Sequence, residues 1–220
     1  MQKIQTLVIT FLAIGMINCL PSGDEVTKLP GWKGPLKSKM YAGYIPAGQT
    51  HELGIEHNLF EHYIFIESEK SPANDPLIIW TNGGPGAASY FGLFIELGPY
   101  YLSSASLKTE EYLLTKVPTL FDNIHSWTKV ANLLIINSPP PVGYSYCSPI
   151  GPSGNGTSCG TWNDSKTAVH NAIYIDNWFK AFPEYGSHEF FIIGESYGGI
   201  YVPTLVRELL NYYPDLTKNL

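Results

Sequence analysis

The chain has 220 residues, of which 44% are hydrophobic and only 15% are charged. This composition excludes an intrinsically disordered protein, and the length is sufficient for one substantial hydrophobic core. The net charge is −6 at pH 7, and no run of basic residues offers a phosphate-binding stripe. We therefore expect no nucleic acid partner.

The first twenty residues predict a cleavable signal peptide. Lys3 precedes an uncharged apolar stretch from Leu7 to Ile17, and small or turn-forming residues follow from Cys19 onwards. The stretch is too short to span a bilayer, and no second long apolar segment occurs later. We expect residues 1–20 to be removed. The mature chain, with no membrane span, would then follow the secretory pathway to the cell exterior, a vacuole or a lysosome.

Five short segments predict β-strands. Side chains in Met40–Pro46 and in His62–Glu67 alternate between apolar and polar, a pattern typical of half-buried strands. The other three are continuous apolar runs, at Leu77–Trp80, Leu133–Ile136 and Phe190–Ile193. Continuous runs of this length suit parallel strands that are covered by helices on both faces.

Two helices are predicted from apolar residues at helical spacing. The first covers Ser165–Phe182, with Asp164 or Ser165 as its N-cap. The second covers Ile200–Tyr213, where Pro203 is expected in the first turn because a proline is tolerated there. Strands that alternate with helices predict an α/β layered sheet, and no linker divides the mature chain into two domains.

The cysteines and two glycosylation sequons agree with export. Cys19 lies at or before the expected cleavage point, which leaves Cys147 and Cys159 to pair in an oxidising compartment. Asn155 and Asn163 each begin an acceptor sequence for N-glycosylation. The mature protein is therefore expected to be a disulfide-bonded glycoprotein.

A candidate nucleophile lies between the last predicted strand and the last predicted helix. The segment Gly194-Glu195-Ser196-Tyr197-Gly198 has the G-x-S-x-G pattern of a nucleophile elbow. In such an elbow the serine occupies a strained turn, and glycines prevent collisions with the strand and the helix. The alternative interpretation is a tight glycine turn without a catalytic role.

A second glycine-rich turn has the sequence WTNGGPG and covers residues 80–86, directly after an apolar run. Backbone N–H groups in such a turn can form an oxyanion hole, because no Cβ blocks the approach of a substrate carbonyl. The alternative interpretation is a plain β-to-α loop in a layered sheet.

Several strings of the chain resemble the serine carboxypeptidase family, in that family's order and spacing, over nearly the whole mature chain. They are LPG at Leu29, YAGYIP at Tyr41, WTNGGPG at Trp80, ELGPY at Glu96, SWTKVANLLIINSP at Ser126, VGYSYC at Val142 and GESYGGIYVP at Gly194. The resemblance implies an α/β-hydrolase fold, with a mostly parallel central sheet and helices on both of its faces. Residues 21–220 would form the N-terminal half of one such domain.

The resemblance also implies a function, that of a serine-type carboxypeptidase that removes C-terminal residues from peptides or proteins at acidic pH. Ser196 would be the nucleophile, and the N–H groups of Gly84 and Tyr197 the oxyanion hole. The residues that would hold the substrate's C-terminal carboxylate are Trp80, Asn82, Glu96 and Glu195. Two adjacent carboxyl groups raise each other's pKa, and only a protonated carboxyl donates a hydrogen bond to a carboxylate.

The chain departs from the family pattern in three places. Ala87 replaces a frequent cysteine, so one family disulfide is expected to be absent, and Pro141 replaces a glycine. After Ser196 the chain contains one aspartate, Asp215, and no histidine, whereas an α/β-hydrolase orders its triad as Ser, Asp and His. We therefore expect the triad aspartate and histidine to lie beyond residue 220, and this chain alone to be inactive.

Two other functions stay open. A carboxypeptidase-like acyltransferase would use the same residues to pass the acyl group to an alcohol instead of water. A non-catalytic binding or protective protein would need no base. The resemblance implies no cofactor and no metal ion, and it allows a homodimer.

Overall fold

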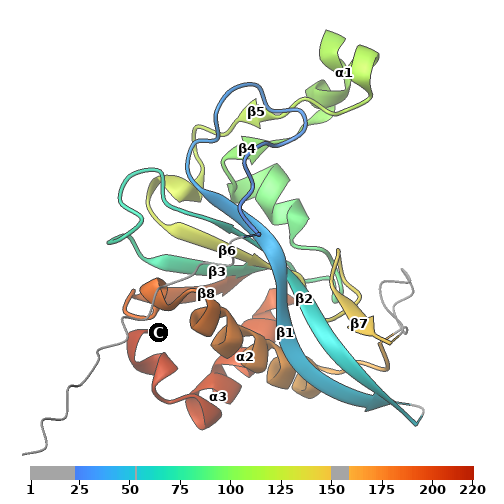
Figure 1. Cartoon of the computed structure of the whole chain (residues 1–220), viewed down its shortest axis with the longest axis vertical. Helices are drawn as coiled ribbons and strands as arrows, with labels where there is room; N and C mark the ends of the chain where they lie inside the picture. Colours follow the sequence, from blue (N-terminus) through green and yellow to red (C-terminus); the bar gives the residue numbers. More distant parts are fainter. Residues whose placement is uncertain (1–22, 53, 150–158) are drawn as a thin grey trace, which may run out of the picture.

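The computed structural model describes residues 23–52, 54–149 and 159–220 (Figure 1). The predicted signal segment and the sequon at Asn155 lie outside the described residues. Within them, no helix combines the length and hydrophobicity needed to cross a lipid bilayer.

Strands and helices alternate along the second half of the described chain, and strands dominate the first half. The strands are β1 (Met40–Glu52), β2 (Ile55–Ile66), β3 (Leu77–Thr81), β4 (Tyr100–Tyr101), β5 (Phe121–Asp122), β6 (Asn132–Ile136), β7 (Tyr146–Ser148) and β8 (Phe190–Gly194). The α-helices are α1 (Glu110–Thr115), α2 (Asp164–Ala181) and α3 (Gly198–Tyr212). A short π-helical segment, η1 (Gly92–Leu97), follows β3, and 3-10 turns form η2 (Ser104–Leu107), η3 (Trp127–Lys129), η4 (Pro183–Tyr185) and η5 (Leu216–Asn219).

The described residues form a mixed main sheet of six strands, in the order β1-β2-β6-β3-β8, with β7 paired to β2. β6, β3 and β8, which contain the three continuous apolar runs, are parallel to one another as predicted. β1 and β2 form a long antiparallel hairpin, and β2 is also antiparallel to β6. The parallel arrangement thus holds for the part of the sheet that carries the candidate nucleophile.

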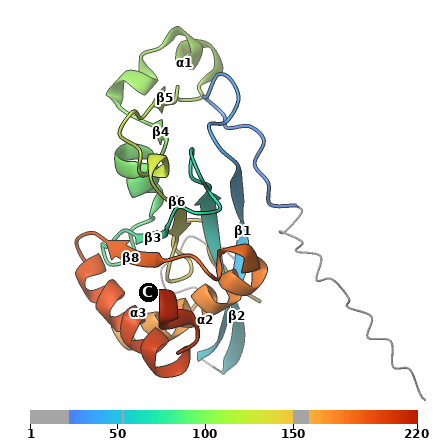
Figure 2. The same ribbon diagram turned by 90° about the vertical axis from the view of Figure 1, so that its left-hand side faces the viewer.

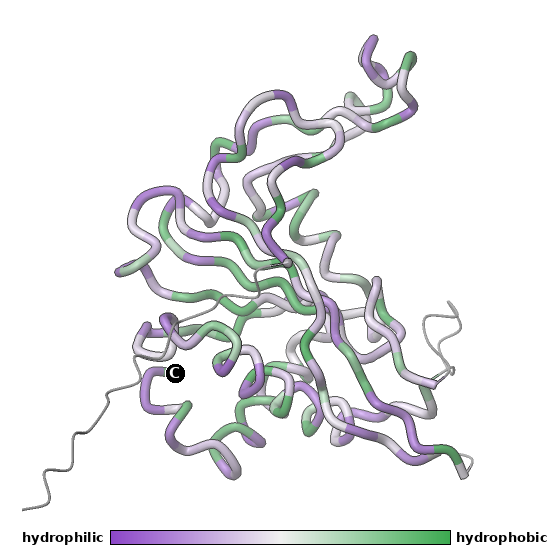
Figure 3. The backbone as a smooth tube through the Cα atoms, viewed as in Figure 1, coloured by the Kyte–Doolittle hydropathy of each residue, from purple (hydrophilic) through white to green (hydrophobic). Residues whose placement is uncertain are grey.

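Both faces of the sheet are covered, because strands β1, β2, β3, β6 and β8 direct side chains into two hydrophobic clusters, one on each face. On β6, Leu134 and Ile136 belong to the cluster that α2 and α3 complete, whereas Leu133 and Ile135 pack in the cluster that contains η1. Hydrophobic segments accordingly run through the centre of the sheet (Figure 3). The predicted cover of helices on both faces is confirmed, with the shorter η1 on one face.

Two details of the predicted helices are wrong. The N-cap of α2 is Asn163 and not Asp164 or Ser165, because Asn163 Oδ1 accepts a hydrogen bond from Lys166 N (2.9 Å). This bond satisfies one of the N–H groups that lack a partner within the helix. α3 begins directly after the glycine turn, so Pro203 lies inside the helix beyond its first turn. The helix continues because the proline removes only one main-chain hydrogen bond.

The predicted disulfide between Cys147 and Cys159 is confirmed, with a Cα–Cα distance of 5.6 Å. It ties β7 to the segment that leads into α2, and both cysteines are buried.

At one end of the long axis, β4, β5 and α1 extend as an arm away from the main sheet (Figure 2). The glycine-rich turns lie elsewhere, at the carboxyl ends of β3 and β8, where ligands bind in open α/β sheets.

Candidate active site

Ser196 lies in a sharp turn between β8 and α3. Its φ angle of 55° is one of two positive φ values at non-glycine residues in the described part of the chain. This conformation costs on the order of 1 kcal/mol for a residue with a Cβ. Gly198 N donates to the Glu195 carbonyl (2.7 Å) and closes the turn. Because Ser196 is exposed, the turn presents its hydroxyl outwards, as a nucleophile elbow does.

The loop after β3 packs directly against this turn. A Cβ on Gly83 would lie 2.4 Å from Tyr197 N and 2.8 Å from the Glu195 carbonyl oxygen. Any side chain at Gly83 would therefore force the two backbones apart. The parallel register pairs Thr81 with Gly194, and a Cβ on Gly194 would lie 3.0 Å from the Thr81 carbonyl oxygen. Pairing of β3 with β8 thus brings the two glycine-rich turns into contact.

The two turns also carry N–H groups without acceptors. Gly84 N and Tyr197 N donate no hydrogen bond to any of the described residues, and Gly84 is exposed with a φ angle of 109°. The neighbouring Gly86 N donates to the Tyr201 hydroxyl on α3 (3.2 Å), which holds the loop against the helix. Unpaired N–H groups on packed turns can stabilise a developing oxyanion.

Asn82 follows β3 and is buried, with 3% of its surface exposed. Its Oδ1 accepts hydrogen bonds from Trp80 Nε1 and from Gly92 N, both at 3.0 Å. Because the side-chain oxygen is occupied, the amide NH₂ is the group left to bind an acceptor. A Cβ on Gly92 would lie 2.3 Å from Trp80 Nε1, so glycine is required there. Trp80, itself buried, therefore orients the Asn82 amide.

Two carboxyl groups, those of Glu96 and Glu195, interact with each other. Glu96 lies on η1, the segment whose Gly92 contacts Asn82, and its carboxyl interacts with that of Glu195 beside the elbow. Partial burial raises the pKa of Glu96, and the charge of Glu195 and a hydrogen bond to its side chain raise it further. Glu96 therefore keeps its proton to a higher pH than an isolated glutamate, and in its protonated form it can donate a hydrogen bond to an anion.

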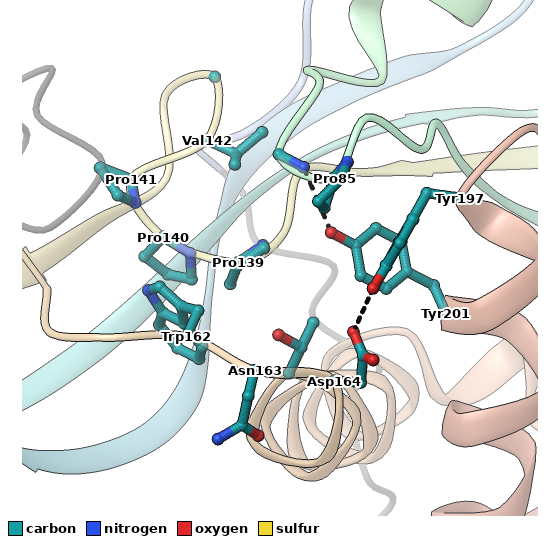
Figure 4. Close-up of a pocket in the computed structure, with 13 residues that line it drawn as sticks. Pro85, Pro139, Pro140, Pro141, Val142, Trp162, Asn163, Asp164, Tyr197 and Tyr201 are labelled. Atoms are coloured by element: carbon teal, nitrogen blue, oxygen red, sulfur yellow. Dashed lines mark hydrogen bonds between the residues drawn. The ribbon is translucent and has the colours of Figure 1, made fainter.

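A cavity of about 740 Å³ opens beside the elbow (Figure 4). Its walls include Tyr197 and Tyr201, the proline run at 139–141, and Trp162 before α2. The Tyr197 hydroxyl donates to Asp164 (2.9 Å) across one side of the cavity. The lining combines these rings and prolines with the polar side chains of Asn163, Asp164 and Thr167.

A sequence model of the serine carboxypeptidase family matches residues 30–220. The chain belongs to the serine carboxypeptidase family. Serine carboxypeptidase-like 20 from Arabidopsis thaliana and serine carboxypeptidase 1 from Hordeum vulgare are each 40% identical to it, over 86% of this chain and 34% of each relative. The chain thus spans about a third of the length of these curated relatives.

The fold agrees with this assignment. The chain is similar to a solved structure of Kex1(delta)p, a prohormone-processing carboxypeptidase from Saccharomyces cerevisiae, with a TM-score of 0.70 and 26% sequence identity. The similarity covers 90% of this chain and 40% of that one. The predicted family and the predicted α/β-hydrolase fold are therefore confirmed.

In this member of the serine carboxypeptidase family, the residues predicted for the site form two adjoining groups. The first lies around the elbow and comprises Gly84, Ser196 and Tyr197; the second comprises Trp80, Asn82, Glu96 and Glu195. Pro141, which departs from the family pattern, lies in the wall of the cavity, and so does Asn163, one of the two predicted glycosylation sites.

Three residues at the site were not predicted from the sequence. They are Tyr201, which binds Gly86 N, and the pair of Ser89 and Asn137 behind Asn82. Tyr201 and Asn137 lie in sequence strings that resemble the family, and this location could have marked them as candidate site residues. Their hydrogen-bond partners, however, come from distant parts of the chain.

Three of the described histidines, His62, His170 and His188, have hydrogen-bond partners other than Ser196. His62 Nδ1 is hydrogen-bonded to the Tyr90 hydroxyl (2.8 Å), and burial lowers the pKa of His62 to about 4. His170 and His188 each bind a main-chain carbonyl, at 2.7 and 3.1 Å. No hydrogen bond connects Ser196 to a histidine within the described residues.

Proposed function

We propose that the protein is a serine-type carboxypeptidase, which hydrolyses the last peptide bond of peptides or proteins through an acyl-enzyme on Ser196. The observation that carries the proposal is the contact between the Ser196 turn and the Gly83–Gly84 turn, which is so close that a Cβ on Gly83 would collide with Tyr197 N. This contact supports a nucleophile next to an oxyanion hole.

In the proposed mechanism, Ser196 Oγ attacks the carbonyl carbon of the last peptide bond. The carbonyl oxygen becomes an oxyanion, which the N–H groups of Gly84 and Tyr197 stabilise. The C–N bond then breaks, the C-terminal residue leaves with a proton, and water hydrolyses the acyl-enzyme. The base that transfers these protons is, in this proposal, a histidine oriented by an aspartate, both located after residue 220.

Recognition of a free C-terminus completes the proposal. The Asn82 amide and the protonated pair of Glu96 and Glu195 donate hydrogen bonds to the substrate carboxylate, while Trp80 keeps Asn82 oriented. The pKa of Glu96 is raised, so the pair loses its proton, and its affinity for an anion, as the pH rises through that raised value. We therefore propose activity at acidic pH.

The nucleophile is tested on the product of the complete gene, with a serine-directed phosphonylating reagent and a blocked dipeptide substrate. The reagent should label Ser196, and Ser196→Ala should lose both labelling and turnover, the latter by several orders of magnitude. Ser187→Ala, at an exposed serine before β8, is the matched control and should retain both. Labelling at another residue, or turnover by the Ser196→Ala variant, would overturn the proposal.

The carboxylate-binding pair is tested by the pH dependence of KM. In the wild type, KM should rise as the pH increases, because the pair loses its shared proton. Glu195→Gln should flatten this rise, since an amide donates a hydrogen bond at every pH. Glu189→Gln, at an exposed site before β8, should leave the profile unchanged. Parallel profiles for Glu195→Gln and the wild type would rule out this role.

We also propose that residues 1–20 are a signal peptide and that the protein is exported, to the cell exterior, a vacuole or a lysosome, and glycosylated at Asn155 and Asn163. N-terminal sequencing of exported protein should begin between about Cys19 and Asp24. Recovery of the initiator methionine would contradict the signal peptide. We further propose that the protein forms a homodimer. Sedimentation of the purified protein would measure its molecular mass and so test this.

A further inference from the structure

Asn137 is a fully buried amide immediately after β6, at 0% exposure. Its Oδ1 accepts a hydrogen bond from Ser89 N (3.0 Å), and Ser89 Oγ in turn accepts one from Asn82 N (2.9 Å). We propose that Asn137 is a positioning residue, which acts through Ser89 to hold Asn82 in place for the substrate's C-terminal carboxylate. The inference rests on the carboxypeptidase function proposed above.

Asn137 is well suited to this role because hydrogen bonds to neighbouring parts of the sheet hold its backbone in place. Its main-chain N–H donates to the His62 carbonyl on β2 (3.3 Å), and its own carbonyl accepts from Ser145 Oγ (2.5 Å). Ser145 Oγ accepts a further hydrogen bond from His62 N (2.8 Å). The Asn137 amide therefore projects from a rigid part of the fold, as a residue that positions others must.

The loop that contains Gly143 packs closely against the Asn137 side chain. A Cβ on Gly143 would lie 2.9 Å from Asn137 Oδ1 and 3.0 Å from the Tyr90 ring. The proline-rich segment thus passes directly above the Asn137 amide and keeps water from replacing Ser89 N as its partner. Ser89 is 1% exposed, so its N–H would be left unsatisfied if Asn137 lost its side-chain oxygen.

The position of Asn82 depends on the hydrogen bonds that connect it through Ser89 to Asn137. The side-chain oxygen of Asn82 is bound by Trp80 Nε1 and Gly92 N, and its main-chain N–H is bound by Ser89 Oγ. Loss of the Ser89 contact would let the backbone of Asn82 rotate, and its NH₂ group would turn with it. Hydrogen-bonding groups that recognise a substrate must be held within about 0.5 Å of the productive position, so recognition would weaken.

Asn132, the first residue of β6, provides a matched control. It is also 0% exposed, and its amide also fixes a loop: Oδ1 accepts from Ser68 N (2.9 Å), and Nδ2 donates to the carbonyls of Pro72 (3.0 Å) and Asp75 (2.9 Å). Asn132 lies at the start of β6 and Asn137 follows its end. Loss of the Asn132 amide should therefore destabilise the fold without affecting Asn82.

The experiment compares kcat/KM for a blocked dipeptide with a free carboxylate and for the same dipeptide with a C-terminal amide, using the product of the complete gene. In Asn137→Ala the preference for the free acid should fall about tenfold, the size expected for one unsatisfied buried N–H. Asn137→Asp should retain more of the preference than Asn137→Ala, because a carboxyl oxygen still accepts from Ser89 N, although the bond from Asn137 Nδ2 to the His62 carbonyl (3.5 Å) is lost. Asn132→Ala should lower the melting temperature but keep the preference.

A second variant, Ser89→Ala, removes only the hydroxyl that accepts from Asn82 N. It should lower the preference for the free acid by a similar factor. It decides the question if Asn137→Ala does not fold. An unchanged preference in either folded variant would overturn the positioning role, and so would an equal loss in Asn132→Ala. A wild-type protein that does not hydrolyse the free acid, or does not prefer it to the amide, would instead contradict the proposed carboxypeptidase function.

Discussion

Glu61 offers a test of the buried core, through the substitution Glu61→Gln. Its side chain projects from β2 into the core, and the residue is fully buried. Oε1 accepts a hydrogen bond from Ser138 Oγ (3.1 Å), whereas Oε2 has no partner among the described residues. The buried Tyr174 hydroxyl on α2 also lacks one. No ion pair compensates a charge on Glu61 within the described part of the chain.

Burial raises the pKa of Glu61 to about 8, from an ordinary value of 4.5, and the hydrogen bond from Ser138 offsets part of the increase. The folded protein therefore keeps a proton that the unfolded chain releases above pH 4.5. The free energy of unfolding is unaffected below that pH, and it decreases as the pH rises towards the folded-state pKa. At pH 7 the loss is about 3 kcal/mol, at about 1.4 kcal/mol per pH unit.

Glu61→Gln removes the ionisation and keeps the shape of the side chain. The variant should match the wild type near pH 4 and exceed its stability by about 3 kcal/mol at pH 7, measured by urea unfolding at a series of pH values. Glu208→Gln is the control, because Glu208 is also buried but its Oε1 accepts two hydrogen bonds from Arg207. It should show no such gain. A constant difference between Glu61→Gln and the wild type across this pH range would refute a buried, protonated Glu61.

Two further predictions concern the turn and the helix cap. Gly83→Ala should lower stability by about 1–3 kcal/mol, because its Cβ would collide with Tyr197 N. Gly199→Ala, with nothing within 4 Å of the new Cβ, should instead raise it by about 0.5–1 kcal/mol in α3. Thermal unfolding measures both, and equal shifts would contradict the packing argument. Asn163→Ala should cost about 1 kcal/mol through the lost N-cap, whereas Ser165→Ala should remove the same sequon and leave the cap intact. Equal destabilisation by the two variants, compared as unglycosylated protein, would show that the cap contributes little.

The sequence by itself determined the features that depend on local chemistry. The three apolar runs predicted the parallel strands, because a strand that is covered on both faces needs no polar positions. The G-x-S-x-G pattern predicted the strand, turn and helix around Ser196, because few other residues tolerate that turn. The disulfide followed from Cys147 and Cys159 being the cysteines left after the expected cleavage. The family strings supplied the candidate site residues.

Only the tertiary structure decided which segments meet. Alternation of side chains does not reveal that β2 pairs with β6, and the antiparallel hairpin was therefore not predicted. Glu61 lies outside the strand predicted at His62–Glu67, yet it belongs to β2 and is fully buried. The hydrogen bonds from Asn82 through Ser89 to Asn137 join residues that are 48 positions apart at their widest step. A hydrogen bond requires two groups within about 3 Å of each other, and such proximity between distant residues arises only when the sheet has formed.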